Sequence, residues 1–133
     1  MPEEVLETLS LATLPALKQP LDAGLFGGVI TLPDGKHYAV VLLADKPEQP
    51  LPWKKAMDWA EGLGNGAALP TRPIAAMLFA NAKDQFAPEW HWTSESFDGS
   101  YAWGQLFNTG YQNLNHKSFE GRCRAVRLIQ LVS

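Results

Sequence analysis

The feature that most constrains the fold is the last third of the chain, where aromatic, turn and basic residues recur with a period of two. Within residues 90–95, Trp90 and Trp92 fall on one side of an extended strand, while His91 and Thr93 fall on the other. Asp98-Gly99 and residues 108–110 carry turn sequences. The segment therefore predicts an antiparallel meander of about four strands, the last running over roughly residues 122–131.

The middle of the chain predicts a hairpin and two helices. Residues 25–32 and 36–43 are apolar and β-branched, and Pro33-Asp34-Gly35 between them favours a tight reversal. One helix is expected to start at Pro52, and a second at Thr71, whose hydroxyl suits an N-cap. The buried stripes expected at helical spacing are Trp53, Ala56, Met57 and Ala60, then Ile74, Met77, Leu78 and Ala82. The predicted class is α+β with segregated elements.

Residues 1–24 are rich in leucine and are expected to stand outside the main domain, which covers residues 25–133. The leucine spacing permits a short helix near residues 3–12, and Pro15 and Pro20 would prevent its continuation. An arm that lies on the domain or on a neighbouring subunit fits the same residues, so both alternatives stay open.

Size and charge exclude some classes of function. A chain of 133 residues fits one domain. Its formal net charge of −3 argues against general electrostatic binding of nucleic acid. The basic residues Lys117, Arg122, Arg124 and Arg127 are expected to form structural ion pairs rather than a phosphate track. No run approaches the roughly 20 apolar residues of a membrane span, and the acidic start lacks a secretion signal. We therefore expect no membrane partner and synthesis in the cytoplasm.

Six short motifs follow one another along the chain. They are Trp53 with Ala56 and Ala60, Leu69-Pro70-Thr71, Trp92-Thr93-Ser94, Ala102-Trp103, Phe107 with Gly110, and Arg122-Cys123-Arg124-Ala125-Val126-Arg127. In this order they resemble the Lcl C-terminal domain family, a domain of bacteria and phages. The resemblance covers roughly residues 25–131, and it implies a C-type-lectin-like fold, shared with formylglycine-generating enzymes, whose ligand surfaces lie on the last sheet and its loops. Ala68 departs from the arginine that is usual in the family.

Catalysis is the less favoured class of function. Formylglycine-type chemistry needs reactive thiols, whereas the single cysteine, Cys123, lies in a predicted core strand and is expected to be a buried structural thiol. None of the three histidines has a metal partner at i+2 or i+4. Glu89, Glu95 and Asp98 are close enough in sequence to bind calcium, but the sugar-site motifs of lectins are absent. The sequence predicts no enzyme, no metal and no cofactor.

Recognition of a protein or glycan ligand is the favoured function. Residues 108–118 have the Tyr, Asn, Gln and His composition of recognition loops, although such loops are often only turns. The aromatic residues of the meander would add a contact patch if one row is exposed, and the alternative is that they form core. The residues expected to be exposed and to bind the ligand are Tyr101, Gln105, Tyr111, Gln112, Asn113, Asn115 and His116.

A second hypothesis, from a different class of function, is a small intracellular phage regulator, such as an anti-defence factor that binds a host protein complex. The missing secretion signal and the negative charge suit it. The recognition domain would instead belong to a phage or prophage and could associate with the virion. The sequence leaves the oligomeric state open.

Overall fold

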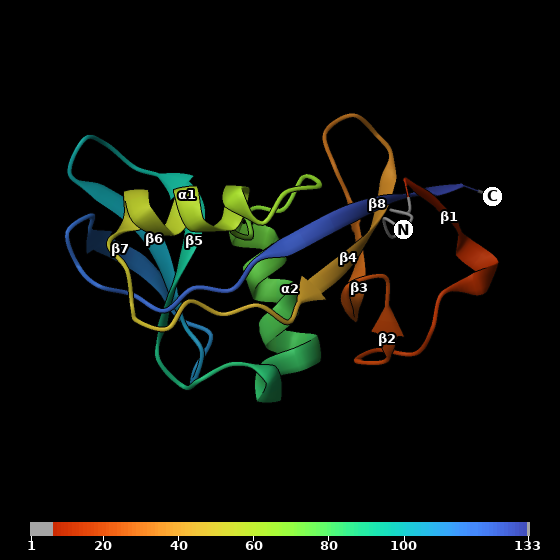
Figure 1. Ribbon diagram of the computed structural model, residues 1–133, viewed down its shortest axis with the longest axis horizontal. Coiled ribbons are helices and arrows are strands. Elements are labelled where there is room, and N and C mark those ends of the chain that lie inside the picture. The colour runs from red at the N-terminus through yellow and green to blue at the C-terminus, as the bar shows by residue number, and fades with distance from the viewer. Residues whose placement is uncertain (1–6, 133) are drawn as a thin grey trace.

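The computed structural model describes residues 7–132 and has an α+β fold built from two sheets and two α-helices (Figure 1). In chain order, with η for a 3-10 helix, the elements are β1 (Thr8–Ser10), η1 (Leu11–Thr13), β2 (Pro20–Leu21), β3 (Gly24–Thr31), β4 (His37–Leu43), α1 (Trp53–Gly62), α2 (Arg72–Ala82), η2 (Lys83–Gln85), β5 (Trp90–Ser96), β6 (Tyr101–Leu106), β7 (Gln112–His116) and β8 (Val126–Val132).

The larger sheet has five strands in the order β1-β8-β4-β3-β2. The predicted hairpin is confirmed as β3 and β4, which pair antiparallel with a bulge between Phe26 and Gly28. Gly28 has a φ of +129°, and a Cβ there would lie 2.8 Å from the Met77 sulfur, so glycine suits both the backbone and the approach of α2. Strand β4 is central, and residues 39–43 are buried on both of its faces.

Both predicted helices are confirmed. Helix α1 follows Pro52 and buries Ala56 and Ala60. Helix α2 begins after Thr71, whose hydroxyl accepts a hydrogen bond from the Ile74 amide, as expected of an N-cap. Helix α2 lies between the two sheets and contacts β3 on one side and β5 and β6 on the other (Figure 1).

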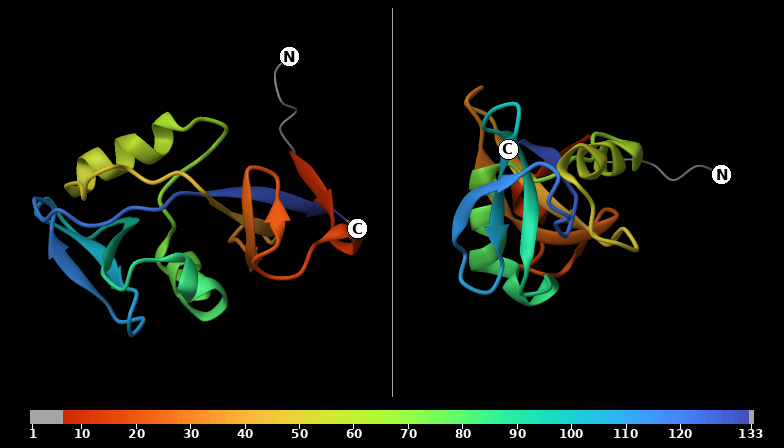
Figure 2. Two further views of the ribbon diagram at one scale, coloured as in Figure 1. Left: turned by 60° about the horizontal axis from the view of Figure 1, so that its bottom comes forward. Right: turned by 90° about the vertical axis from the view of Figure 1, so that its left-hand side faces the viewer.

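The predicted four-stranded meander is wrong in its last strand. Strands β5, β6 and β7 form a three-stranded antiparallel sheet, but β8 leaves it and pairs antiparallel with β4 and parallel with β1. Residues 117–125 carry the chain across, running beside residues 44–52 through a bridge between Leu51 and Gly121 (Figure 2). The reason is that β4 would otherwise be an edge strand with unpaired backbone groups, and the apolar β8 covers it.

The N-terminal segment contributes strands to the larger sheet. Residues 8–10 pair with β8, and residues 20–21 pair with β3. The short helix expected near residues 3–12 is therefore wrong for residues 8–10, which form β1. Residues 11–12 begin the 3-10 helix η1, and residues 3–6 lie outside the described range. Asp22 also anchors this segment, because its carboxylate accepts a hydrogen bond from the Arg127 guanidinium at 3.1 Å.

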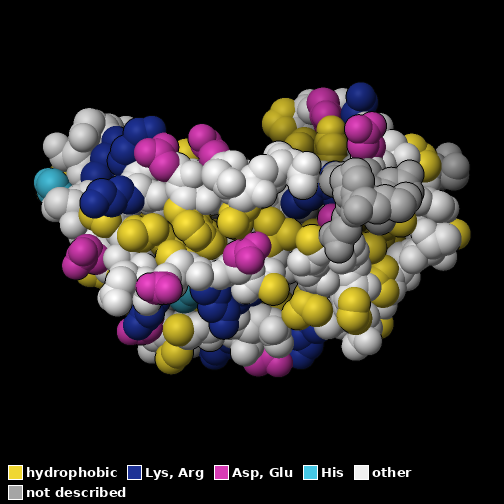
Figure 3. Space-filling view, viewed as in Figure 1, with side chains coloured by type: hydrophobic (Ala, Val, Ile, Leu, Met, Phe, Trp, Pro, Cys, Tyr) yellow, Lys and Arg dark blue, Asp and Glu magenta, His cyan; other side chains and the backbone are white. Residues whose placement is uncertain are grey.

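Two hydrophobic clusters hold the elements together. One lies under α1 and joins both sheets, with Trp92 and Val41 among its members. The other surrounds α2 and includes Leu78 and Phe107. On the side seen in Figure 3, hydrophobic side chains reach the surface as a band beside α1, with charged side chains on both sides of it. Within residues 7–132, no helix combines the length and apolar character of a membrane span.

Candidate functional site

The seven predicted ligand residues divide between the two faces of the three-stranded sheet. Strand register places Gln105 opposite Gln112 and Tyr101 opposite His116, so these four share one face. Asn113 lies opposite Gly104 and Asn115 opposite Ala102, on the other face. Tyr111 comes directly before β7, and its ring lies edge-on to Trp90, which belongs to that second face. We call the face of Trp90, Tyr111, Asn113 and Asn115 the open face, and the opposite one the helix face.

Gln105 is wrong as an exposed ligand residue, because its side chain is fully buried on the helix face. Its amide nitrogen donates to the Ala75 carbonyl of α2 at 2.7 Å, and its amide oxygen accepts from Gln112 at 2.8 Å. Gln112 is half-buried, donates also to the Arg72 carbonyl and accepts from the Arg72 guanidinium. These two glutamines join the sheet to the first turn of α2 and are structural residues.

The helix face also carries the aromatic side chains of Trp103 and Tyr101, both residues of β6. The Arg72 guanidinium carbon lies 3.5 Å from the centre of the Trp103 ring. Further along, Tyr101 is 41% exposed and its ring lies edge-on to His116, which is also exposed. Tyr101 and His116 are therefore accessible as predicted, but they lie on the opposite side of the sheet from Tyr111, Asn113 and Asn115.

The open face is formed around a glycine. A Cβ at Gly104 would lie 3.0 Å from the Asn115 amide nitrogen and 3.4 Å from the Trp90 ring, so both side chains sit directly over the bare backbone. Trp90 is half-buried, and its ring is nearly perpendicular to that of Tyr111, with centroids 6.4 Å apart. Tyr111 is 53% exposed, so the face presents aromatic surface to its surroundings.

Several polar groups of the open face form no hydrogen bond with the described part of the chain. Within residues 7–132, no hydrogen bond involves the Trp90 indole nitrogen, the Tyr111 hydroxyl or the Asn115 side chain. Asn113 uses only its amide oxygen, which accepts from the Leu114 backbone amide at 2.8 Å. By contrast, the indole nitrogens of Trp53 and Trp92 both donate to backbone carbonyls. The open face therefore keeps donors and acceptors available beside its rings.

A cleft of about 290 Å³ adjoins this face at Trp90. Its walls include Trp90 and Leu106 from the sheet and Phe119 from the loop after β7. Phe119 is 42% exposed and lies edge-on to the buried Trp92. The cleft has the apolar lining with nearby polar groups that is common in ligand sites.

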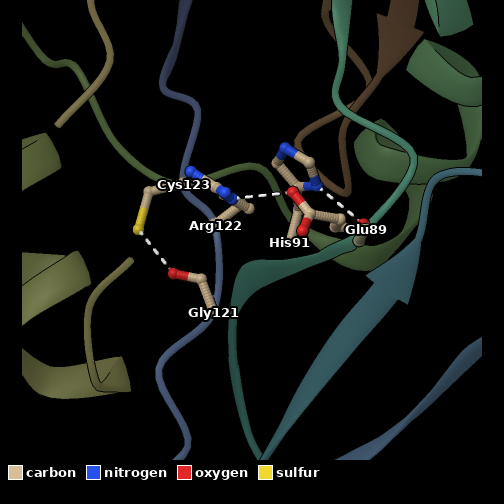
Figure 4. A network of polar contacts seen from close by, with 5 residues as sticks. All are labelled: Glu89, His91, Gly121, Arg122 and Cys123. Carbon is tan, nitrogen blue, oxygen red and sulfur yellow. Dashed lines mark hydrogen bonds and ion pairs between the residues drawn. The ribbon is translucent and has the colours of Figure 1, made fainter. Parts of the chain in front are cut away.

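The Cys123 thiol does not have the setting of a nucleophile. Cys123 lies in the extended segment before β8, is 3% exposed, and donates to the Gly121 carbonyl (Figure 4). Burial raises the pKa of its thiol to about 12, so the thiolate is scarce at neutral pH. The neighbouring Arg122 points away from it, toward Glu89, as strand alternation predicts (Figure 4).

His91 is a buried neutral residue rather than an exposed acid or base. Its Nδ1 lies 2.9 Å from the Glu89 carbonyl oxygen, so Nδ1 carries the proton. The ring packs edge-on against Phe86 and Phe107. Burial is the main cause that lowers the pKa of His91 to about 4.

The three acidic residues considered for calcium have separate roles. Glu89 pairs with Arg122 at 2.8 Å, and Glu95 accepts from the Arg72 backbone amide at the start of α2. The Asp98 carboxylate accepts from the backbone amides that follow it, which lowers its pKa. Among residues 7–132, no group of three or more His, Cys, Asp or Glu side chains is placed to hold a metal ion.

The sequence matches no family model and none of the curated protein sequences. The resemblance to the Lcl C-terminal domain family therefore stays a prediction that rests on its motifs. Residues 7–132 have the α+β fold class that the order of the predicted helices and strands indicates.

The sequence did not indicate the site residues that lie outside the polar segment 108–118. Trp90, Leu106 and Phe119 line the cleft, but Trp90 was considered only as one of several meander aromatics. A usable signal was present at Gly104, since a glycine within a strand indicates that something approaches the backbone closely.

Proposed function

We propose that this protein is a non-enzymatic recognition domain that binds a protein or glycan ligand through the open face and the adjoining cleft. The observation that carries the proposal is the group formed by Trp90, Tyr111 and Asn115 around Gly104. It combines exposed ring surface with hydrogen-bonding groups that have no partner among the described residues. Aromatic and amide side chains of this kind give large contact area and adaptable hydrogen bonds.

The same proposal includes the finer assignment of the fold. The motifs shared with the Lcl C-terminal domain family support a C-type-lectin-like domain, in which the last sheet and its loops form ligand surfaces. The open face belongs to β5, β6 and β7, the sheet that follows the two helices in the chain, and this position supports the assignment. The buried Cys123 supports a function without thiol chemistry.

The test begins with two screens of the purified protein, one against a glycan array and one against a displayed peptide library. The affinity of the ligand that emerges is then measured for variants of each face. Trp90→Ala and Asn115→Ala are expected to weaken binding by at least about tenfold each, as hot-spot residues do. Tyr101→Ala is the matched control, because Tyr101 is similarly exposed on the opposite face.

Equal loss of affinity in Tyr101→Ala, or none in Trp90→Ala and Asn115→Ala, would show that the ligand binds elsewhere. A glycan ligand, or a surface protein as ligand, would agree with the recognition domain. A host regulatory complex as the partner would favour the intracellular regulator instead.

A further inference from the structure

Arg72 holds its guanidinium group in a defined orientation at the start of α2. The guanidinium carbon lies 3.5 Å from the centre of the Trp103 ring, so the group covers the face of the indole. Its Nε donates to the side-chain oxygen of Gln112 at 2.9 Å. The side-chain nitrogen of Gln112 donates in turn to the Arg72 carbonyl. The indole and the glutamine together fix the direction in which the rest of the guanidinium points.

The two terminal nitrogens of Arg72 are accessible and unpartnered. Within residues 7–132, neither forms a hydrogen bond, and no carboxylate pairs with the guanidinium. Both reach the solvent, because Arg124 Nε is the single enclosed side-chain nitrogen or oxygen without a hydrogen bond in this part of the chain. Arg124 also lacks the ion pair expected for it, but its terminal nitrogens donate to the carbonyls of Gln85 and Leu43. Arg72 therefore presents a pair of donors that Arg124 does not.

One carboxylate lies near Arg72 but is used elsewhere. Glu95 accepts a hydrogen bond from the Arg72 backbone amide at 2.6 Å, so it caps the first turn of α2. The charge of Glu95 offsets part of the charge of the guanidinium. The site therefore suits a singly charged carboxylate better than a phosphate group, which carries about −1.5 to −2 charges at pH 7.

Exposed aromatic side chains extend this surface beyond Arg72. The Phe97 ring is nearly perpendicular to that of Trp103, with centroids 6.4 Å apart, and Phe97 is 59% exposed. Tyr101 comes two residues before Trp103 on the same face of β6 and is also exposed. We call Arg72, Phe97, Tyr101 and Trp103 the arginine patch. Aromatic residues and arginine are enriched in protein interfaces, and exposed apolar patches mark contact sites.

We propose that the arginine patch binds a segment of a partner protein in which an acidic residue stands next to an apolar one. The carboxylate accepts from both terminal nitrogens of Arg72, the arrangement that a guanidinium fork favours. The apolar side chain packs on Phe97 and Trp103. The patch lies across the sheet from the open face, so this inference does not depend on the recognition function proposed above.

The test compares two peptides in titrations of the whole ¹⁵N-labelled protein at constant ionic strength. Acetyl-Asp-Phe-amide carries the carboxylate, and acetyl-Asn-Phe-amide has nearly the same shape without the charge. We expect saturable shifts of the Trp103 indole N–H and of the amides of residues 97 and 101–103. The Asp peptide should bind at least about fivefold more tightly, because hydrogen bonds to a charged group are stronger than neutral ones. Equal affinities, or shifts that never saturate, would overturn the proposal. Tighter binding of the phosphoserine analogue than of the Asp peptide would overturn the choice of a carboxylate.

Two variants separate the ring contact from the charge. Phe97→Ala removes an exposed ring and should weaken both peptides by about threefold or more, whereas unchanged affinities would contradict the assigned surface. Arg72→Lys keeps the charge but not the fork, and it should remove most of the preference for the Asp peptide. Its circular dichroism spectrum must match that of the wild type, since the bond to Gln112 is also lost.

Lys55→Gln is the control, because it removes an exposed cation from α1 and should leave both affinities unchanged. If Lys55→Gln lowers the preference for the Asp peptide while Arg72→Lys leaves it intact, the attraction is general and the arginine patch is not the site.

Discussion

Replacement of Gln105 by leucine tests whether the three-stranded sheet is attached to α2 as described. The variant keeps the size of a fully buried side chain but removes its hydrogen bonds to the Ala75 carbonyl and the Gln112 amide. Each bond contributes about 0.5–1.5 kcal/mol net, so the two together predict a loss of roughly 2 kcal/mol in the free energy of unfolding. For a chain of this size, that loss lowers Tm by about 6–8 °C.

The assay is urea unfolding followed by tryptophan fluorescence, which five tryptophans make sensitive. Asn113→Ala is the matched control, because Asn113 is exposed on the open face of the neighbouring strand and should change stability by less than about 0.5 kcal/mol. The double variant Gln105→Leu/Gln112→Leu should lose less than the sum of the single losses, since the two glutamines bond to each other. Wild-type stability in Gln105→Leu would refute the structural role of this residue.

Three further predictions concern buried groups. The folded pKa of His91, about 4, lies below its unfolded value, so the unfolded state binds the proton first. Stability should therefore fall as the pH falls from about 6.5 to 4, by up to roughly 3 kcal/mol, and His91→Phe should flatten that slope in pH-dependent urea titrations. Cys123 should react with an aromatic disulfide reagent only on unfolding, and rapid labelling of the native thiol would contradict its burial. Asp22→Asn leaves the largely buried Arg127 without this carboxylate and should cost about 2 kcal/mol in calorimetry, whereas an unchanged Tm would mean that the ion pair contributes nothing.

The hairpin and both helices could be predicted because their signals are local. Pro33-Asp34-Gly35 specifies the reversal between β3 and β4, and Thr71 caps α2 with its own side chain. The pairing of β8 with β4 was not predictable in the same way. Its alternating residues fit either sheet, and the choice depends on which edge strand, β4 or β7, most needs to be covered.

The sequence predicted only part of the candidate site, because burial there also depends on tertiary contacts. Strand alternation indicates which residues share a face, but it does not indicate which face a helix covers. Gln105 looks like a surface residue from its polarity, yet the backbone carbonyl of Ala75 gives it a buried partner. Asn115 has the same polarity and no such partner within the described residues. The difference comes from the position of α2, which only the tertiary structure defines.

The most direct test of the open face is ¹H–¹⁵N chemical-shift mapping of the protein with the ligand found by the screens. The account predicts that the largest changes fall on the Trp90 indole N–H and on the amides of residues 104–106 and 111–115. Changes centred instead on Tyr101 and His116, across the sheet, would contradict it.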